Sequence, residues 1–416
     1  MSLSDSAVPD VVEVGDPRPS EITLGALFLK FLRFGCLAFG GPVAQIAMIR
    51  HALIDGERWM SSARFNRLLA VMQVLPGPEA HELCVHLGMR ARGRIGGVLA
   101  GLGFMLPGFV LMLGLAWLYF LIDFDRPWIS GAMLAIQAAV IGLILRAIQR
   151  IGQHVLTDRW LWAVGIGAGI AGLAGVSFWI SLPAAGIIHA LIGLKRPGWA
   201  VAVGAVAVGL AIVMAQGIVT PASIAALRPD AQGPGSAPLW LVFLSGLKAG
   251  LLTFGGAYTA IPFIRQDIAG RGWMSDGQFL DGVALSGVLP APLIIFATFV
   301  GYVAGGFGGA LAMTAGVFLP AFAFSLVFYD RLEGVLENAR LRDLLDGVAA
   351  GVVGLIAATS LQLAWGLAHE AGWGLRLAVL AGLMAAALAL AWRWKSPVAT
   401  PAIIAGAAVC GGLMLQ

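Results

Sequence analysis

Two cations occupy matching places in a chain that carries few charges. Arg33 stands six residues before Phe39-Gly40-Gly41, and Lys248 stands six residues before Phe254-Gly255-Gly256. Both lie inside apolar stretches, where a charge is costly and usually functional. Because no Asp or Glu occurs within ten residues of either cation, the sequence favours an anion site over a structural ion pair.

The residues that follow these cations predict interruptions of the helices. Proline removes a helical donor, so Gly40-Gly41-Pro42 should break the first apolar segment. A helix that restarts after such a break presents free N–H groups and a positive dipole end to an anion. Pro76-Gly77-Pro78 and Pro290-Ala291-Pro292 predict the same break in the next segment of each half. The candidate substrate-binding residues are Arg33, Lys248, Phe39, Gly40, Gly41, Pro42, Phe254, Gly255, Gly256, Pro76, Gly77, Pro78, Pro290 and Pro292.

Carboxylates inside apolar segments are few, and Glu79 and Glu82 lie directly after a predicted break. Coupling of transport to a proton and ion pairing with Arg90 or Arg33 are equally open roles for them. The second half has apolar residues at the matching places, Leu293 and Phe296. Symmetric substrate binding therefore cannot need these carboxylates.

A second matching pair of cations, Arg50 and Arg265, lies at the far ends of the same two segments. We expect both to anchor the chain at the membrane surface by extending their charged ends into the interface, and a role in gating is the alternative. Lys30 has Ser245 as its counterpart and is expected at a membrane surface as well.

Metal and enzyme chemistry find little support in the chain. His81 and His86 are five positions apart with Cys84 between them, a spacing that does not place both rings on one helical face. We expect no metal and no cofactor, and Cys36, Cys84 and Cys410 fit simple packing. No phosphate-binding loop, nucleophile motif or catalytic carboxylate pair occurs in the sequence. The sequence predicts a protein that is not an enzyme.

The elements that must position these residues follow from composition. The 416 residues are 59% hydrophobic and only 12% charged, where soluble domains carry about 25% charged residues. The mean hydropathy is +0.89, and apolar windows of roughly 20 residues recur throughout. Stretches such as 198–216 do not alternate as barrel strands would. We predict an all-α polytopic membrane protein whose partner is the lipid bilayer, with no nucleic acid.

One unit is used twice along the chain. Phe39-Gly40-Gly41 recurs as Phe254-Gly255-Gly256, and Trp59-Met60 recurs as Trp273-Met274, at offsets between 213 and 215 residues. Leu75-Pro76-Gly77-Pro78 has its counterpart in Leu289-Pro290-Ala291-Pro292. Duplicated halves with broken helices are typical of secondary transporters, whose substrate lies where the repeats meet.

The predicted domains are an N-terminal tail, two repeats and a linker between them. We expect residues 1–20 to be a disordered tail, 21–216 the first repeat, 217–238 the linker and 239–416 the second repeat. Thirteen candidate spans would place the two copies in inverted orientation. Arginines on both sides of 66–90, however, favour one cytoplasmic side. That segment would then be re-entrant, so we expect about 10 to 13 transmembrane segments.

These motifs together resemble the chromate ion transporter family. The resemblance rests on Phe39-Gly40-Gly41-Pro42, on Leu75-Pro76-Gly77-Pro78-Glu79-Ala80 with Gly88, and on Phe254-Gly255-Gly256, and it covers about residues 22–415. It implies two halves in opposite orientations and export of chromate across the bacterial inner membrane, with a role in chromate resistance. The basic residue before the first motif is usually lysine in the family, and Arg33 departs from that pattern.

The resemblance leaves the substrate and the assembly open. Sulfate or another oxyanion would use the same features, and an anion channel is a further alternative. We expect chromate or a similar small oxyanion to bind between the breaks, and a homodimer is compatible with the sequence.

Overall fold

The computed structural model describes residues 21–72, 77–123, 126–215, 235–254, 256–328 and 339–415. Helices form nearly all of these residues, as the composition predicts. The N-terminal tail and positions 217–234 of the linker lie outside the described residues, so the predicted domain limits are not tested.

The first half begins with two short helices and continues into longer ones. In chain order these are α1 (Leu24–Cys36), α2 (Gly41–Ile49), the π-helical η1 (Arg50–Gly56), α3 (Ser62–Met72), α4 (Glu79–Tyr119), α5 (Pro127–Val155), α6 (Arg159–Leu173) and α7 (Phe178–Gly193). Helix α8 (Pro197–Ala215) then leads towards the second half. The second half repeats the order with α10 (Leu239–Leu251), η2 (Ala257–Ala260), α11 (Ile261–Arg271), α12 (Asp276–Val288), η3 (Leu293–Ile295), α13 (Phe296–Ala323), η4 (Phe324–Phe328), α15 (Ala339–Ala371), α16 (Leu375–Arg393) and α17 (Ala399–Met414).

The two halves share a backbone reversal at matching positions. In α4, Arg92 (φ −141°, ψ 33°) and Gly93 (φ 64°, ψ −163°) leave the helical region. In α13, Gly305 (φ −145°, ψ 25°) and Gly306 (φ 61°, ψ −151°) do the same. Glycine suits the second position of each pair because it adopts a positive φ without steric cost. The near identity of the angles supports the duplication that the sequence predicts.

Each reversal folds its helix into a tight hairpin. The Cα of Gly88 faces the carbonyl of Gly96 in α4, and Gly301 faces Gly309 in α13 in the same way. Residues eight positions apart in a straight helix would be about 12 Å apart, so these contacts exist only because the chain turns back. A side chain at any of the four glycines would meet the opposite backbone.

The predicted interruptions are present in both halves. Gly40 and Gly41 have positive φ values of 88° and 77° at the start of α2, and Gly77 before α4 has a φ of 146°. In the second half, Leu289 and Pro292 between α12 and η3 have ψ angles of 150° and 130°, outside the helical region. In the first half Arg90 Nε donates to the Trp59 carbonyl at 3.3 Å, so the end of segment 66–90 lies near the residues that precede its start. That proximity is compatible with a re-entrant segment, and the re-entrant arrangement stays a prediction.

Several helices suit a bilayer. Among the described residues, five are long and apolar enough to cross a membrane: Glu79–Tyr119, Pro127–Val155, Leu293–Val327, Arg340–Ala371 and Leu375–Arg393. The chain is thus a multi-pass membrane protein of helical class, as predicted.

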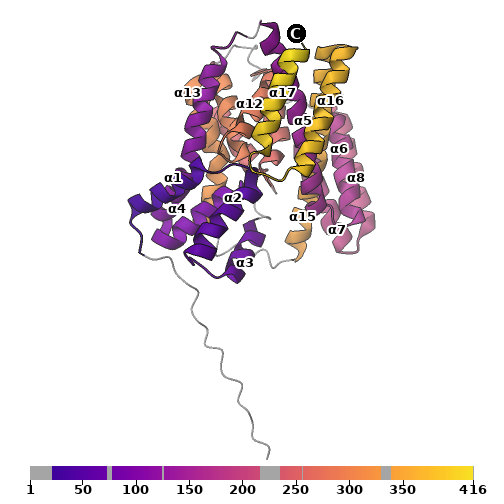
Figure 1. The fold of residues 1–416 in the computed structure, drawn as a ribbon. Helices are drawn as coiled ribbons and strands as arrows, with labels where there is room; N and C mark the ends of the chain where they lie inside the picture. The colour runs from indigo at the N-terminus through magenta and orange to yellow at the C-terminus, as the bar shows by residue number, and fades with distance from the viewer. Residues whose placement is uncertain are drawn as a thin grey trace, which may run out of the picture.

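The two halves exchange their C-terminal helices. Helix α15 packs on α6 and α7 of the first half, and α5 packs on α16 and α17 of the second. In Figure 1, α1, α2 and α3 lie in the lower part of the molecule and α12 and α17 in the upper part. Gly152 near the end of α5 contacts Val353 in the first half of α15. Gln137, earlier in α5, and Glu370, at the end of α15, both act on Asp281. Helices α5 and α15 therefore run antiparallel, as an inverted repeat requires.

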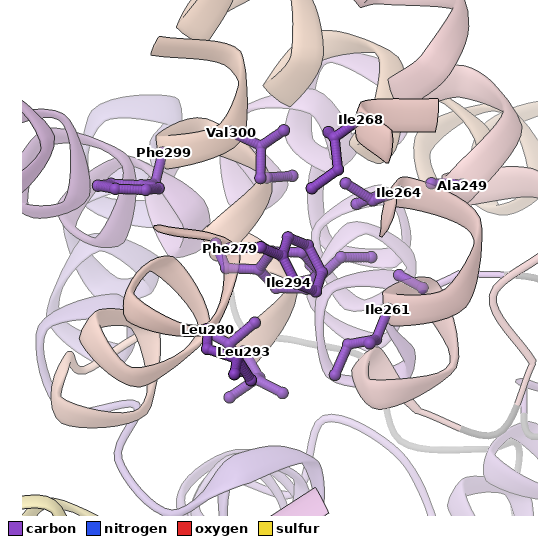
Figure 2. Packing of buried hydrophobic residues seen from close by; sticks show 14 of the residues in the cluster. Ala249, Ile261, Ile264, Ile268, Phe279, Leu280, Leu293, Ile294, Phe299 and Val300 are labelled. Carbon is purple, nitrogen blue, oxygen red and sulfur yellow. The ribbon is translucent and has the colours of Figure 1, made fainter. Parts of the chain in front are cut away.

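Apolar side chains hold each half together. Figure 2 shows Ile261, Ile264 and Ile268 of α11 facing the side chains of α12 and α13. Phe279 and Phe299, from α12 and α13, are fully buried in the same cluster. This packing fixes the broken segments of the second half against one another.

Candidate functional site

A cavity of about 470 Å³ lies where breaks from the two halves meet. Gly40, Gly41 and Pro42 line it from the first half. The second half contributes Tyr258 and the stretch Leu289, Ala291 and Leu293 between α12 and α13. An alanine methyl at position 41 would meet open space, so the start of α2 faces the cavity.

Hydrogen bonds join the breaks in pairs across the two halves. Gln45 Nε2 donates to the Ala38 carbonyl at 2.8 Å and to the Ala291 carbonyl at 3.1 Å. The Gly77 N–H donates to the Thr253 carbonyl at 2.7 Å. The first break of each half thus contacts the second break of the other half, which holds non-helical backbone in place inside the protein.

Three cations line this cavity, and the sequence reasoning missed all three. Arg146 and Arg150 come from α5, and Lys395 comes from the connection between α16 and α17. Arg146 donates to Gln149 Oε1 at 2.8 Å, with its guanidinium 5.9 Å from the Trp392 ring centroid. The rule that a charge inside an apolar span is by default functional could have found both arginines, because they lie within the apolar stretch that forms α5.

Arg150 differs from Arg146 in having no fixed partner. Among the described residues, its half-buried guanidinium makes no hydrogen bond and no ion pair within 4 Å. It lines the first cavity with Tyr258 and the second with Glu79. Its charge is therefore available to a bound anion.

A second cavity of about 430 Å³ adjoins the first. Pro42, Val43 and Arg150 line both cavities. Beyond them the second cavity is lined by Glu79, Phe254, His154 and Asp346, with apolar side chains of α5, α6 and α15.

The structure brings part of the predicted site to these cavities. Gly40, Gly41, Pro42, Phe254 and Glu79 line one or both of them. The remaining described candidates line neither cavity: Arg33, Lys248, Phe39, Gly256, Gly77, Pro78, Pro290, Pro292, Glu82, Arg50 and Arg265. Pro76 and Gly255 lie outside the described residues.

Lys248 has a carboxylate partner, so the expectation that it lacks one is wrong. Its ammonium forms an ion pair with Asp267 of α11, which also accepts a hydrogen bond from Ser245. The ammonium also lies 5.0 Å from the Phe178 ring centroid. Asp267 is nineteen residues away in sequence and reaches Lys248 because α11 folds back beside α10. Whether Lys248 also binds an anion stays a prediction.

Arg33, its counterpart, is exposed and has no hydrogen bond or ion pair with any described residue. Lys30, one turn earlier, pairs instead with Glu57, with its ammonium 2.6 Å from Oε1. Whether Lys30 also reaches a membrane surface stays a prediction. Its ion pair connects α1 to the end of η1 in the first half, whereas the pair of Lys248 with Asp267 connects α10 to α11 in the second half.

Arg50 and Arg265 also differ from each other in exposure and in hydrogen-bond partners. The Arg50 side chain is 40% exposed, 3.9 Å from Asp55 and 3.4 Å from Asn66 Oδ1, which fits an interfacial anchor. Arg265 is only 17% exposed and donates twice to Asp276 and once to Gln362. The anchor interpretation is wrong for Arg265, because folding brings α12 and α15 around it.

Glu82 is fully buried in α4, and neither carboxylate oxygen has a hydrogen-bond partner among the described residues. Pairing with Arg90 or Arg33, one of the two open interpretations, is not observed. His81 lies between the rings of Phe318 and Phe322, each 4.8 Å away between centroids, so an aromatic environment surrounds it.

Comparison with known proteins assigns the chain to a family. The family described as "Chromate transporter" matches residues 25–210 and again 240–412. A chromate transport protein of Pseudomonas aeruginosa is 59% identical over 396 residues, which cover 95% of this chain and 94% of that protein. A chromate transport protein of Cupriavidus metallidurans is 31% identical, covering 97% of this chain and 96% of its own length. A probable chromate transport protein of Synechococcus elongatus is 27% identical, over 94% and 95% of the two chains. No solved structure matches the chain.

Proposed function

The chain belongs to the chromate transporter family, and from this premise we propose that it exports chromate from the bacterial cytoplasm. The proposal makes it a transporter in the inner membrane, embedded in the lipid bilayer, and not an enzyme. Export would confer resistance to chromate on the cell.

The observation that carries the proposal is the cavity at the broken helices. Chromate is a tetrahedral dianion, and the cavity presents Arg146, Arg150 and Lys395 together with the N-terminal end of α2 at Gly41. Arginine offers a planar fork of donors that suits oxyanions, and a helix N-terminus adds backbone donors and a positive dipole end. Among the residues that the structure describes, no carboxylate lines this cavity, so its described lining places no negative side chain beside an anion.

The position of the cavity fits alternating access. Its walls come from both halves, so a change in their relative position would open and close it. Arg33 lies exposed near the end of α1, seven residues before the Gly40 break, and would draw anions towards the site through its charge.

Export needs no coupling ion. Moving two negative charges outward across an inside-negative potential of about 100 mV releases roughly 4.6 kcal/mol, at about 2.3 kcal/mol per charge. The membrane potential alone can therefore drive chromate out of the cell.

The test is transport by the purified protein in liposomes under an imposed potential. We expect radiolabelled chromate to accumulate when the lumen is positive, and the accumulation to saturate with chromate concentration. Accumulation no faster than in protein-free liposomes would contradict the proposal.

The same liposomes separate the alternative substrates and mechanisms. Unlabelled sulfate and molybdate are added in excess: competition by sulfate as strong as by chromate would indicate a general oxyanion transporter. Flux that rises linearly without saturation would indicate a channel. Growth of cells with and without the protein on chromate then tests resistance.

A further inference from the structure

We propose that Arg150 passes the oxyanion between the two cavities, and that Glu79 is the internal anion which the substrate displaces from it. The inference rests on the proposed function and adds to it a route, a transfer residue and a role for a carboxylate.

The route follows from the way the cavities adjoin. One is lined by α5 from Leu143 to Arg150, and the other by α5 from Arg150 onward, with Leu161 of α6 beyond. Pro42, Val43 and Arg150 stand at the junction. Any anion that moves from one cavity to the other must therefore pass the Arg150 guanidinium.

Two arginines and a histidine recur along this route at helical spacing. Arg146, Arg150 and His154 are four positions apart on α5, so they lie on one face. Each step rises about 6 Å along the axis. His154 Nδ1 is 2.8 Å from the Arg150 carbonyl oxygen, which orients the ring along the same face. An anion released by Arg146 thus finds Arg150 one turn further on.

Glu79 is placed to compete with the anion for Arg150. It is buried in the first turn of α4, directly after Pro78, and lines the second cavity with Arg150 and His154. Among the described residues, no hydrogen bond fixes its carboxyl to either side chain. A carboxylate that shares a cavity with Arg150 without being hydrogen-bonded to it can neutralise the guanidinium when the site is empty and can be displaced by a dianion.

A second carboxylate, Asp346 of α15, also lines this cavity. We assign the role of internal counter-ion to Glu79, because it directly follows the Pro78 break and lines the cavity beside Pro42 and Arg150.

This arrangement explains why only the first half carries the carboxylate. An internal anion that competes with the substrate weakens binding but speeds release, because it regains Arg150 as the substrate leaves. A transporter needs both steps, since an anion held too tightly by several cations would not move on.

The experiment measures chromate transport in liposomes for four variants: Arg150→Ala, Arg150→Lys, Glu79→Gln and the double variant Glu79→Gln/Arg150→Ala. We expect Arg150→Ala to raise KM about tenfold or more, because a charged partner of the anion is lost. Arg150→Lys keeps the charge and should recover part of the affinity. Glu79→Gln should lower KM about threefold and slow the maximal rate.

The double variant shows whether Glu79 affects chromate binding through Arg150 or independently of it. If Glu79 acts by competing for Arg150, Glu79→Gln changes KM little once Arg150 is alanine. An equal effect of Glu79→Gln with and without Arg150 would overturn the inference, and so would a parental KM in Arg150→Ala. Arg376→Ala, an exposed arginine of α16, is the control and should behave as the parent.

Failure of this inference and failure of the proposed function give different results. If the parent protein does not transport chromate, the proposed function is wrong. If the parent transports chromate and every Arg150 variant matches it in KM, only the transfer route is wrong. Elution of each variant as a single folded species in detergent shows that a raised KM is not due to misfolding.

Discussion

The two halves of the protein have similar backbone conformations but different patterns of charged residues. The reversal at Arg92 and Gly93 reappears at Gly305 and Gly306 with almost the same angles. On the helix that follows, the first half carries Arg146, Arg150 and His154. An offset of 213 residues, which the two reversals follow, places uncharged side chains opposite them: Thr359, Leu363 and Leu367.

This difference teaches that the duplication provides the backbone fold in both halves, whereas the charged residues along the cavities come from α5 of the first half. Each half has its own pair of glycine contacts because α4 and α13 must each fold into a hairpin. Cations are needed along only one path, and a second set on α15 would place unpaired charge inside the membrane at a high cost. The following substitutions test this division, from the largest expected effect to the smallest.

The first comparison concerns the matched cations Lys248 and Arg33. Lys248→Ala leaves Asp267 largely buried without its partner, which we expect to cost about 3–5 kcal/mol. Arg33→Ala removes an exposed side chain and should change stability by less than about 0.5 kcal/mol. Thermal unfolding in detergent measures both. Equal losses would show that Arg33 has a structural partner too. If both variants transport chromate at the parental rate, neither cation belongs to an anion site.

The second comparison concerns the hairpin glycines. A valine at Gly96 would collide with the Gly88 carbonyl, and one at Gly309 with the Gly301 carbonyl. Because the obstacle is backbone in both cases, we expect each substitution to cost about 1–3 kcal/mol or more. Unfolding temperature and the yield of folded protein are the measurements. A large loss in one half with none in the other would break the equivalence of the scaffolds.

The third comparison sets Arg150 against Leu363, its counterpart on α15. Arg150→Ala should raise the KM for chromate about tenfold, or about 1.4 kcal/mol, with little loss of stability. Leu363→Met keeps the buried volume and should leave KM unchanged. Substrate titrations in liposomes give both values. An equal rise in KM for the two variants would mean that both halves contribute to chromate binding.

The smallest effect is expected for the ion pair that connects α1 to the end of η1. The Lys30 and Glu57 side chains are 27% and 44% exposed, so water screens their attraction. Lys30→Met should cost about 0.2–1 kcal/mol, well below the loss for Lys248→Ala, and should not alter chromate transport. A loss of stability as large as that of Lys248→Ala would mean that the Lys30–Glu57 pair stabilises the protein as much as the Lys248–Asp267 pair.

Much of the scaffold could be predicted because its signals are local. Gly40-Gly41-Pro42 breaks a helix through its own backbone, and the apolar segments require a bilayer through their own composition. The candidate site could be predicted only in part. Arg146 and Arg150 were within reach of the same rule that selected Arg33, but the sequence does not show which face of α5 they occupy.

The sequence by itself therefore determined the membrane class, the duplication and the places where helices break, because each depends on residues near one another in the chain. Only the tertiary structure decided which charges are available. Asp267 neutralises Lys248 and Asp276 clamps Arg265 because helices fold back on each other. Arg150 lines the same cavity as the Gly41 end of α2 because α5 runs beside the breaks of the two halves. Charge pairing acts through distances of a few ångströms in space, and those distances are set by packing between segments far apart in sequence.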